Sequence, residues 1–166
     1  MFKTADLCDE HSDTLFIAQP LFNDYGQKIT FGGKISTVKC FEDNSLVRKQ
    51  LEQPGNGRVL VIDGGGSTRC AMVGDILAQM GADNCWAGII VYGCIRDSGV
   101  ISTINIGVKA MGTFPLKSVK KGEGEIDVTV HFADVDFIPG HFVYADEDGI
   151  IISAKSLAYH SRYLVL

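Results

Sequence analysis

Two apolar runs rich in β-branched residues, with one predicted helix between them, constrain the fold of this chain more than any other feature. Val59–Ile62 leads into an aspartate and three glycines, and Ala87–Tyr92 leads into Gly-Cys-Ile-Arg-Asp. Both runs are typical of buried strands. Between them, the apolar spacing that follows Asp75 indicates an amphipathic helix beginning near that residue. The stretch therefore predicts a βαβ unit with parallel strands.

The loops after these two strands are where we expect a functional site. In a βαβ unit the carboxyl ends of the parallel strands share one edge of the sheet. The turn Gly64–Gly66, the helix start at Gly74–Asp75 and the pair Arg96–Asp97 could therefore converge in one cleft. The spacing to be explained is Gly-Asp, then twenty residues, then Arg-Asp.

The turn Gly64–Gly66 has two interpretations. Its sequence, GGGSTR, does not match the GxGxxG pattern, and no GxxxxGK[ST] occurs in the chain, so neither dinucleotide nor P-loop phosphate binding is supported. The turn could simply be a tight connection. Alternatively, its small residues let backbone amides approach a ligand carboxylate, with help from Ser67 and Arg69.

Arg96, Asp97 and Asp75 also allow a structural and a functional interpretation. Arg96 and Asp97 could be a loop ion pair or solvated charges. Functionally, Asp97 is a hard oxygen ligand suited to Mg²⁺ or Mn²⁺, and Arg96 is a planar fork for a carboxylate or a developing enolate oxygen. Asp75 could cap the helix, whose free amides would still be available to an anion.

Composition narrows the class of protein. With 166 residues and 46% hydrophobic content, the chain is long enough for one domain, 1–166, and short for two. The net charge is −5, and no run of lysine or arginine exceeds two residues, which disfavours direct binding to nucleic acid or to an anionic membrane. Five cysteines without a CxxC pair fit reduced thiols, and no apolar run is long enough to span a bilayer. We therefore expect a cytoplasmic protein.

Outside the central unit the sequence predicts two short helices followed by a β-rich carboxyl half. The predicted segments are a helix capped by Thr4 or Asp6, a bent strand or bulged hairpin at Ile29–Val38, a helix at Ser45–Leu51 capped by Asn44 or Ser45, a short helix or turn at Ile101–Ile106, strands at Val108–Phe114 and Asp127–Phe132, a hairpin made of Phe142–Ala145 and Ile150–Ser153, and a tail at Ala154–Leu166 that forms a helix or a loosely held arm.

Several of these runs carry a family resemblance. FGGKISTVKCFEDN (Phe31–Asn44), VLVIDGGGSTRCA (Val59–Ala71) and Gly-Asp with Arg-Asp strongly resemble the RraA family, named for the regulator of RNase E activity, which also contains class II 4-hydroxy-4-methyl-2-oxoglutarate aldolases. The resemblance covers nearly the whole chain. It implies an α/β fold, a single-domain swivelling β/β/α sandwich, assembled as a ring-shaped homotrimer that can stack into a hexamer and has its sites between subunits.

The resemblance also implies an activity, because the aldolases of the family share the pattern Asp-x20-Arg-Asp. The implied reaction is cleavage of a 4-hydroxy-2-oxo acid to pyruvate, with oxaloacetate decarboxylation through the same pyruvate enolate. A divalent cation, Mg²⁺ or Mn²⁺, is the implied cofactor. The implied roles are metal binding by Asp97, stabilisation of the enolate by Arg96, retention of a proton-carrying water by Asp75, and carboxylate binding by the backbone amides of Gly74, Asp75, Ile76 and Leu77.

Other functions stay open at this point. A lysine forming a Schiff base could replace the metal, with Lys34, Lys39 and Lys109 as nominal candidates. A methyltransferase of menaquinone synthesis would need a cofactor glycine fingerprint, which the sequence lacks.

The main rival is a non-catalytic regulator that binds RNase E. Acidic residues could face the arginine-rich scaffold region of such a partner, and that binding would weaken with salt. The acids in question are Glu123, Glu125, Asp127, Asp134, Asp136, Asp146, Glu147 and Asp148. They could equally be solvated loop residues.

Overall fold

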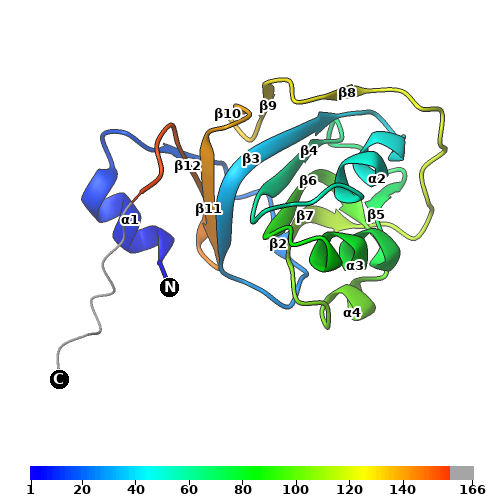
Figure 1. Ribbon diagram of the computed structural model, residues 1–166, viewed down its shortest axis with the longest axis horizontal. Helices are drawn as coiled ribbons and strands as arrows, with labels where there is room; N and C mark the ends of the chain where they lie inside the picture. Colours follow the sequence, from blue (N-terminus) through cyan, green and yellow to red (C-terminus); the bar gives the residue numbers. More distant parts are fainter. Residues whose placement is uncertain (158–166) are drawn as a thin grey trace.

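A computed structural model describes residues 1–157 of the chain (Figure 1). The helices are α1 (Thr4–His11), α2 (Ser45–Leu51), α3 (Asp75–Asp83) and α4 (Ser98–Ile101). The strands are β1 (Phe16–Ile17), β2 (Asn23–Asp24), β3 (Phe31–Lys39), β4 (Val59–Asp63), β5 (Ala71–Val73), β6 (Gly88–Ile95), β7 (Gly107–Thr113), β8 (Glu125–Ile126), β9 (Val130–Phe132), β10 (Val135–Phe137), β11 (Phe142–Asp146) and β12 (Gly149–Ser153).

The predicted βαβ unit is confirmed and forms the centre of the fold. β4 pairs with β6 in parallel, with Leu60 opposite Ile89, and α3 lies between them in the chain. Strands β3, β4, β6 and β7 are successive parallel neighbours. The carboxyl ends of β4 and β6 therefore lie at the same edge of the sheet, as the sequence predicted.

Two apolar cores cover the two faces of this sheet. Leu60 and Ile62 of β4 pack with α2 and α3 on one face, whereas Val59 and Val61 pack with β9 to β12 on the other. Figure 1 shows the corresponding layers, with α2, α3 and α4 together on one side of the sheet and the β11–β12 hairpin, flanked by α1, at the far end. Because both faces of β4 are buried, the strand is a continuous apolar run. The arrangement confirms the predicted α/β fold class.

β3 connects the two parts of the sheet. Its first half pairs with β11 and its second half pairs in parallel with β4, so the long strand predicted around Ile29–Val38 is a single strand and not a hairpin. Gly32 allows this close approach, because a Cβ there would lie 2.8 Å from the carbonyl oxygen of Val143. The glycines are architectural, as their position inside a strand indicates.

Both amino-terminal helices exist, and Asn44 is the N-cap residue of α2, but no predicted cap residue makes a side-chain capping hydrogen bond. At α1, the carboxylate of Asp146 accepts hydrogen bonds from the amide and hydroxyl of Thr4, at 2.7 and 2.6 Å, and neither Thr4 nor Asp6 acts as the cap. At α2, the side chain of Asp43 accepts from the amide of Ser45 at 2.9 Å, so neither Asn44 nor Ser45 caps it through its side chain. The local sequence around each helix start did not indicate that the carboxylates of Asp146 and Asp43 would accept these hydrogen bonds.

The carboxyl half is β-rich as predicted, although some strands are shorter. The strand expected at Asp127–Phe132 is shorter and corresponds to β9. Of the segment Ile101–Ile106, expected as a short helix or turn, only Ile101 is helical, as the last residue of α4. The hairpin β11–β12 is confirmed. Most of the predicted tail, from 158 onward, lies outside the described residues. Within the described part of the chain, no helix is both long and apolar enough to cross a membrane.

Candidate functional site

All six residues predicted to form the site line one pocket, which we call the Asp97 pocket. It has a volume of about 240 Å³ and lies where α3 begins and β6 ends. The predicted residues are Gly74, Asp75, Ile76, Leu77, Arg96 and Asp97, and the rest of the lining comes from Asn44, Arg48, Ala71, Lys117, Ser118 and Lys120. The predicted convergence of the helix start with the Arg-Asp pair is therefore correct.

Asp97 turns its carboxylate back toward the start of α3. Its backbone is in the left-handed region, with φ 56° and ψ 36°, a conformation that aspartate tolerates better than most residues. The Oδ2 atom accepts a hydrogen bond from the amide of Asp75 at 3.2 Å. Within residues 1–157 no hydrogen bond reaches the Oδ1 atom, so this oxygen is available to a ligand.

Gly74 makes room for that carboxylate. A Cβ at this position would lie 2.8 Å from Oδ2 of Asp97 and 3.5 Å from Nε of Arg96. The backbone of Gly74 is extended, so its role is steric rather than conformational. The Gly-Asp and Arg-Asp dipeptides are thus coupled in space, which explains why both occur at this spacing.

The amino terminus of α3 is a set of backbone donors facing the pocket. Gly74 caps the helix without a side-chain hydrogen bond, and Asp75 is the first helical residue. Protein carboxylates occupy two of the donors: the amide of Asp75 donates to Asp97, and the amide of Ile76 donates to Oδ1 of Asp75 at 2.9 Å. The start of α3 therefore already binds carboxylate oxygens. The helix dipole and the unpaired amides of the first turn both favour a negative charge at this position.

Arg96 is held by its backbone and free to reach a ligand with its side chain. Its amide donates to the carbonyl of Val73 at 2.9 Å, which ties the end of β6 to β5. Its Nε lies 3.9 Å from Oδ2 of Asp97, and both side chains are 40% exposed. At that distance the pair is weakly coupled. The guanidinium is therefore not committed to a structural ion pair.

The glycine turn after β4 does not line this pocket. The amides of Gly64 and Gly66 both donate to the carbonyl of Tyr92, at 3.0 and 3.2 Å. The amide of Gly65 donates to Oδ1 of Asp63 at 2.9 Å. The three glycine amides of the turn are thus used within the protein, which favours the alternative interpretation, a tight connection.

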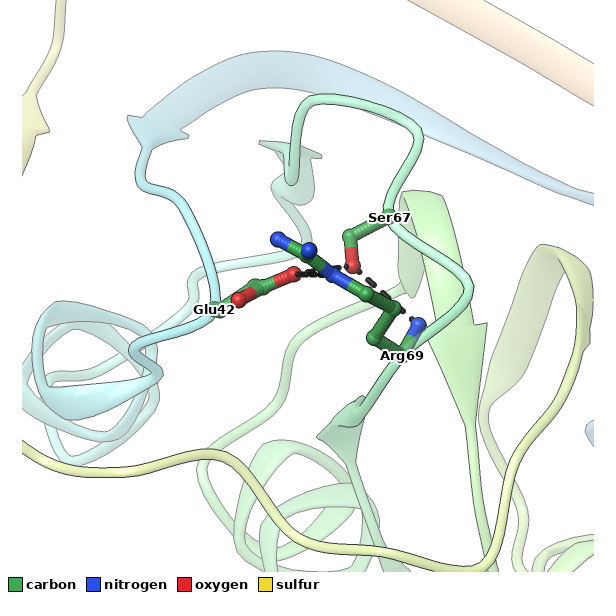
Figure 2. Close-up of polar contacts among 3 residues, drawn as sticks. All are labelled: Glu42, Ser67 and Arg69. Carbon is green, nitrogen blue, oxygen red and sulfur yellow. Dashed lines mark hydrogen bonds and ion pairs between the residues drawn. The ribbon is translucent and has the colours of Figure 1, made fainter.

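Ser67 and Arg69 are also absent from the lining of the Asp97 pocket. Figure 2 shows both side chains meeting Glu42, whose Oε1 lies 2.6 Å from Nε of Arg69 and 2.8 Å from the hydroxyl of Ser67. Hydrogen bonds from Arg69 and then Ser67 lower the pKa of Glu42. This cluster fastens the glycine turn to the loop after β3 through the hydroxyl of Ser67 and Nε of Arg69.

Sequence reasoning missed the far wall of the pocket. No site residue was predicted between the strands at Val108–Phe114 and Asp127–Phe132, but the structure places Lys117, Ser118 and Lys120 in the lining. The segment 115–125 runs next to α2 and β5 (Figure 1), and the backbone of Lys117 forms an isolated parallel β-bridge with Ala71. The signal in the sequence was the concentration of lysines in LKSVKK, which periodicity alone could not place.

The lysines considered for Schiff-base chemistry do not line this pocket. Lys34 and Lys39 are absent from its lining. Lys109 is only 3% exposed, which the sequence did not indicate, and its Nζ lies 2.9 Å from Oδ1 of Asp24. Lys109 therefore serves as a buried ion pair on β7 and is not a nucleophile in the Asp97 pocket.

The residues of the pocket fit a divalent cation that keeps most of its shell for water and substrate. Mg²⁺ in substrate sites is commonly held by one or two carboxylates together with waters. Asp97 supplies a partly exposed carboxylate with one free oxygen, and Asp75 lies beside it. The described residues contain no cluster of three or more histidine, cysteine, aspartate or glutamate side chains that could form a closed cage. Only a sparse carboxylate site is therefore compatible with them.

The fold and the pocket define a class of protein, an α/β sandwich with an acid and arginine site at the carboxyl end of a parallel sheet. The model of the RraA-like family (Aldolase/RraA) matches residues 4–152. The chain belongs to the RraA-like family.

Relatives in this family have more than one printed name. The chain is 59% identical to a protein of Aromatoleum aromaticum named "Putative 4-hydroxy-4-methyl-2-oxoglutarate aldolase", over 94% of this chain and 98% of that protein. A protein of Alkalilimnicola ehrlichii with the same name is 56% identical, over 93% of this chain and 96% of the relative.

Solved structures confirm the fold and add two further names. The RNA-processing inhibitor RraA from Thermus thermophilis superimposes with a TM-score of 0.92 at 39% identity, covering 95% of this chain and 96% of the other. A structure described as an S-adenosylmethionine:2-dimethylmenaquinone methyltransferase from Geobacillus kaustophilus gives a TM-score of 0.91 at 50% identity, covering 94% and 97%. The fold is therefore shared by proteins to which different activities have been attached.

Proposed function

We propose that this protein is a class II, divalent-metal-dependent aldolase that cleaves 4-hydroxy-4-methyl-2-oxoglutarate and related 4-hydroxy-2-oxo acids to pyruvate. The observation that carries this proposal is the convergence of the α3 amides, Arg96 and Asp97 in one pocket. The relatives named as aldolases, at 50–59% identity, support the same class of reaction. A secondary oxaloacetate decarboxylase activity follows from the same site.

Substrate binding would use the donors at the start of α3. The substrate carboxylate would bind near the amides of Gly74, Asp75, Ile76 and Leu77; those of Asp75 and Ile76 already donate to protein carboxylates. The guanidinium of Arg96 would donate to the 2-keto oxygen. Asp97 would hold the divalent cation, which supplies Lewis-acid polarisation of the keto acid when bound.

Bond cleavage then depends on charge developing at the keto oxygen. A proton leaves the 4-hydroxyl group, the C3–C4 bond breaks, and its electron pair moves into the enolate of the first pyruvate while the second product forms its carbonyl. Arg96 would stabilise the enolate oxygen, because its guanidinium can donate hydrogen bonds to the negative charge that develops there. A water held by Asp75 would carry protons, including the one that C3 of the enolate takes up.

Oxaloacetate would react in the same position. Loss of CO₂ from C4 leaves the same pyruvate enolate, so a site that stabilises this charge distribution accelerates both reactions. The methyltransferase name of one relative is less well supported, since the glycine turn lacks a nucleotide fingerprint and spends its amides internally. We also propose a cytoplasmic homotrimer, or a hexamer formed from two trimers.

The proposal is tested with the wild-type protein. Pyruvate release from 4-hydroxy-4-methyl-2-oxoglutarate and from oxaloacetate should require Mg²⁺ or Mn²⁺, and a chelator should remove both activities together. Light scattering should give a trimer or a multiple of it. Absence of pyruvate release with every divalent metal would exclude the aldolase function.

A second candidate, regulation of RNase E, is supported by the solved RraA relative and by exposed acids. Seven of the eight acids that the sequence offered are exposed: Glu123, Glu125, Asp127, Asp134, Asp136, Glu147 and Asp148. Asp146 is only 2% exposed and caps α1, so it is not available to a partner. Binding to the RNase E scaffold should weaken above about 0.15 M salt, where charges more than about 8 Å apart are screened. A pull-down without any binding would exclude this role.

A further inference from the structure

We propose that Asp43 is a positioning residue that clamps the lysine-bearing segment 117–123 onto the start of α2 and so builds the far wall of the Asp97 pocket. The proposal rests on the aldolase function for its effect on substrate, but the clamp itself can be tested without any activity. Asp43 lies outside the lining of the pocket, so its role would be indirect.

The carboxylate of Asp43 joins two segments that are far apart in the chain. Its Oδ1 accepts from the amide and the hydroxyl of Ser45, at 2.9 and 2.6 Å, which fixes it to the first turn of α2. Its Oδ2 accepts from the amides of Lys121 and Glu123, at 2.9 and 3.0 Å. A carboxylate that is 2% exposed thus receives four hydrogen bonds, two from each segment.

The neighbouring residues reinforce the same junction. Glu42 adopts a left-handed conformation, with φ 56°, which turns its own side chain outward to Arg69 while its carbonyl accepts from the amide of Val119 at 3.3 Å. The amide of Asn44 donates to the hydroxyl of Ser118 at 3.2 Å. Backbone contacts thus accompany the clamp, but only Asp43 contributes a buried charge.

The clamped segment brings positive charge to the pocket. Lys117 and Lys120 line it together with Arg48, whereas Arg96 and Asp97 come from the turn between β6 and α4. The proposed substrates are dianions, so a cationic wall contributes to their binding. If the segment moves, these lysines move with it, and substrate affinity falls although Arg96 and Asp97 stay in place.

The clamp works through charge over the range in which the protein would be assayed. Burial alone would raise the pKa of Asp43, but the hydrogen bonds from the Ser45 hydroxyl and from the amides of Glu123, Ser45 and Lys121 outweigh it and lower the pKa to about 2. The carboxylate is therefore ionised well below neutral pH, and hydrogen bonds to a charged acceptor are stronger than neutral ones. Asp43→Asn keeps the shape and removes this charge.

The first test is limited trypsin digestion, because the segment carries Lys117, Lys120 and Lys121. Cleavage of a folded protein follows the population of the locally opened state. Asp43→Asn should speed cleavage within the segment by about tenfold, since it weakens hydrogen bonds that hold the segment closed. Glu42→Gln is the matched control: it removes a neighbouring charge and keeps the backbone contact to Val119, so its cleavage should match the wild type.

The second test separates positioning from general damage. With 4-hydroxy-4-methyl-2-oxoglutarate, Asp43→Asn should raise KM about tenfold and leave kcat within about twofold, the pattern expected when binding is lost without loss of transition-state contacts. A fall in kcat with unchanged KM would overturn the proposal, and so would cleavage at the wild-type rate. If wild type has no lyase activity, the aldolase function fails while the digestion still tests the clamp.

A milder variant covers the case in which Asp43→Asn does not fold. Ser45→Ala removes one donor to Asp43 and also the acceptor for the amide of Gly122, at 3.2 Å. It should increase cleavage in the same segment by a smaller factor than Asp43→Asn. An unchanged cleavage pattern in a folded Ser45→Ala protein would contradict the clamp.

Discussion

The two segments that end the central strands β4 and β6 lie at the same edge of the sheet and differ in the polar groups that they leave free. Each contains an aspartate, Asp63 or Asp97. After β4, Asp63 accepts from Gly65, and the remaining amides donate to Tyr92. After β6, the Asp97 carboxylate keeps one free oxygen in a pocket.

The difference shows that a position at the end of a parallel strand is not enough to make a site. The first turn satisfies its polar groups locally and becomes a rigid connection, reinforced by the cluster of Glu42, Ser67 and Arg69 (Figure 2). The second turn is held by backbone contacts, such as the amide of Arg96 to Val73, so its side chains stay available. A catalytic or binding site is expected where the polar side chains at a strand end are not already used in hydrogen bonds within the protein.

Three substitutions test this comparison, and Arg96→Lys should lower turnover the most of the three. It keeps the charge and loses the planar fork. Loss of one preorganised contact to the enolate oxygen should lower kcat by about 10² to 10³, measured as steady-state pyruvate release. Folding should be unaffected, because the backbone amide that ties Arg96 to Val73 is retained. Turnover close to wild type would contradict a catalytic role and would mean that Arg96 is only a solvated charge.

Gly74→Ala should have an intermediate effect. The new Cβ would displace Asp97, whose Oδ2 lies 2.8 Å from its position. Misplacement of a group in a site by about 1 Å can cost up to about 10² in rate, so turnover should fall by about 10 to 10². The extended backbone accepts alanine, and a thermal melt should therefore barely change. Unaltered activity would mean that the position of Asp97 does not matter.

Arg69→Ala, at the first turn, should have the smallest effect. Arg69 is highly exposed, and its ion pair with Glu42 lies outside the Asp97 pocket. Exposed pairs contribute little to stability. Pyruvate release should stay within about twofold of wild type, as expected for a surface substitution. A loss comparable to that of Arg96→Lys would show that the glycine turn belongs to the site after all.

Much of this arrangement could be predicted from the sequence, because it depends on strong local patterns. The buried runs of β4 and β6 and the amphipathic spacing of α3 fixed the βαβ unit, and the shared edge of parallel strands then brought Gly74, Asp75, Arg96 and Asp97 together. The family resemblance supplied the proposed roles of these residues, which the structure alone does not test.

The parts that could not be predicted depend on long-range contacts. The cap of α1 comes from Asp146, which lies 142 residues away in sequence, and the far wall comes from a loop with no periodic pattern. The amides of Gly64 and Gly66 in the glycine turn donate to the carbonyl of Tyr92, on a neighbouring strand. Sequence periodicity predicts which elements form, but it does not predict which distant polar groups they will bind.

The central claim is that the site lies after β6 and not after β4, and the most direct test compares Asp97→Asn with Asp63→Asn. Both substitutions keep the shape and remove one charge, the first just after β6 and the second at the last residue of β4. Pyruvate release from oxaloacetate should fall to near background in Asp97→Asn and respond only weakly to added Mg²⁺ or Mn²⁺, because a hard cation loses its charged oxygen ligand. Asp63→Asn should retain wild-type turnover, since an amide oxygen can still accept from Gly65. Wild-type turnover in Asp97→Asn would contradict the account.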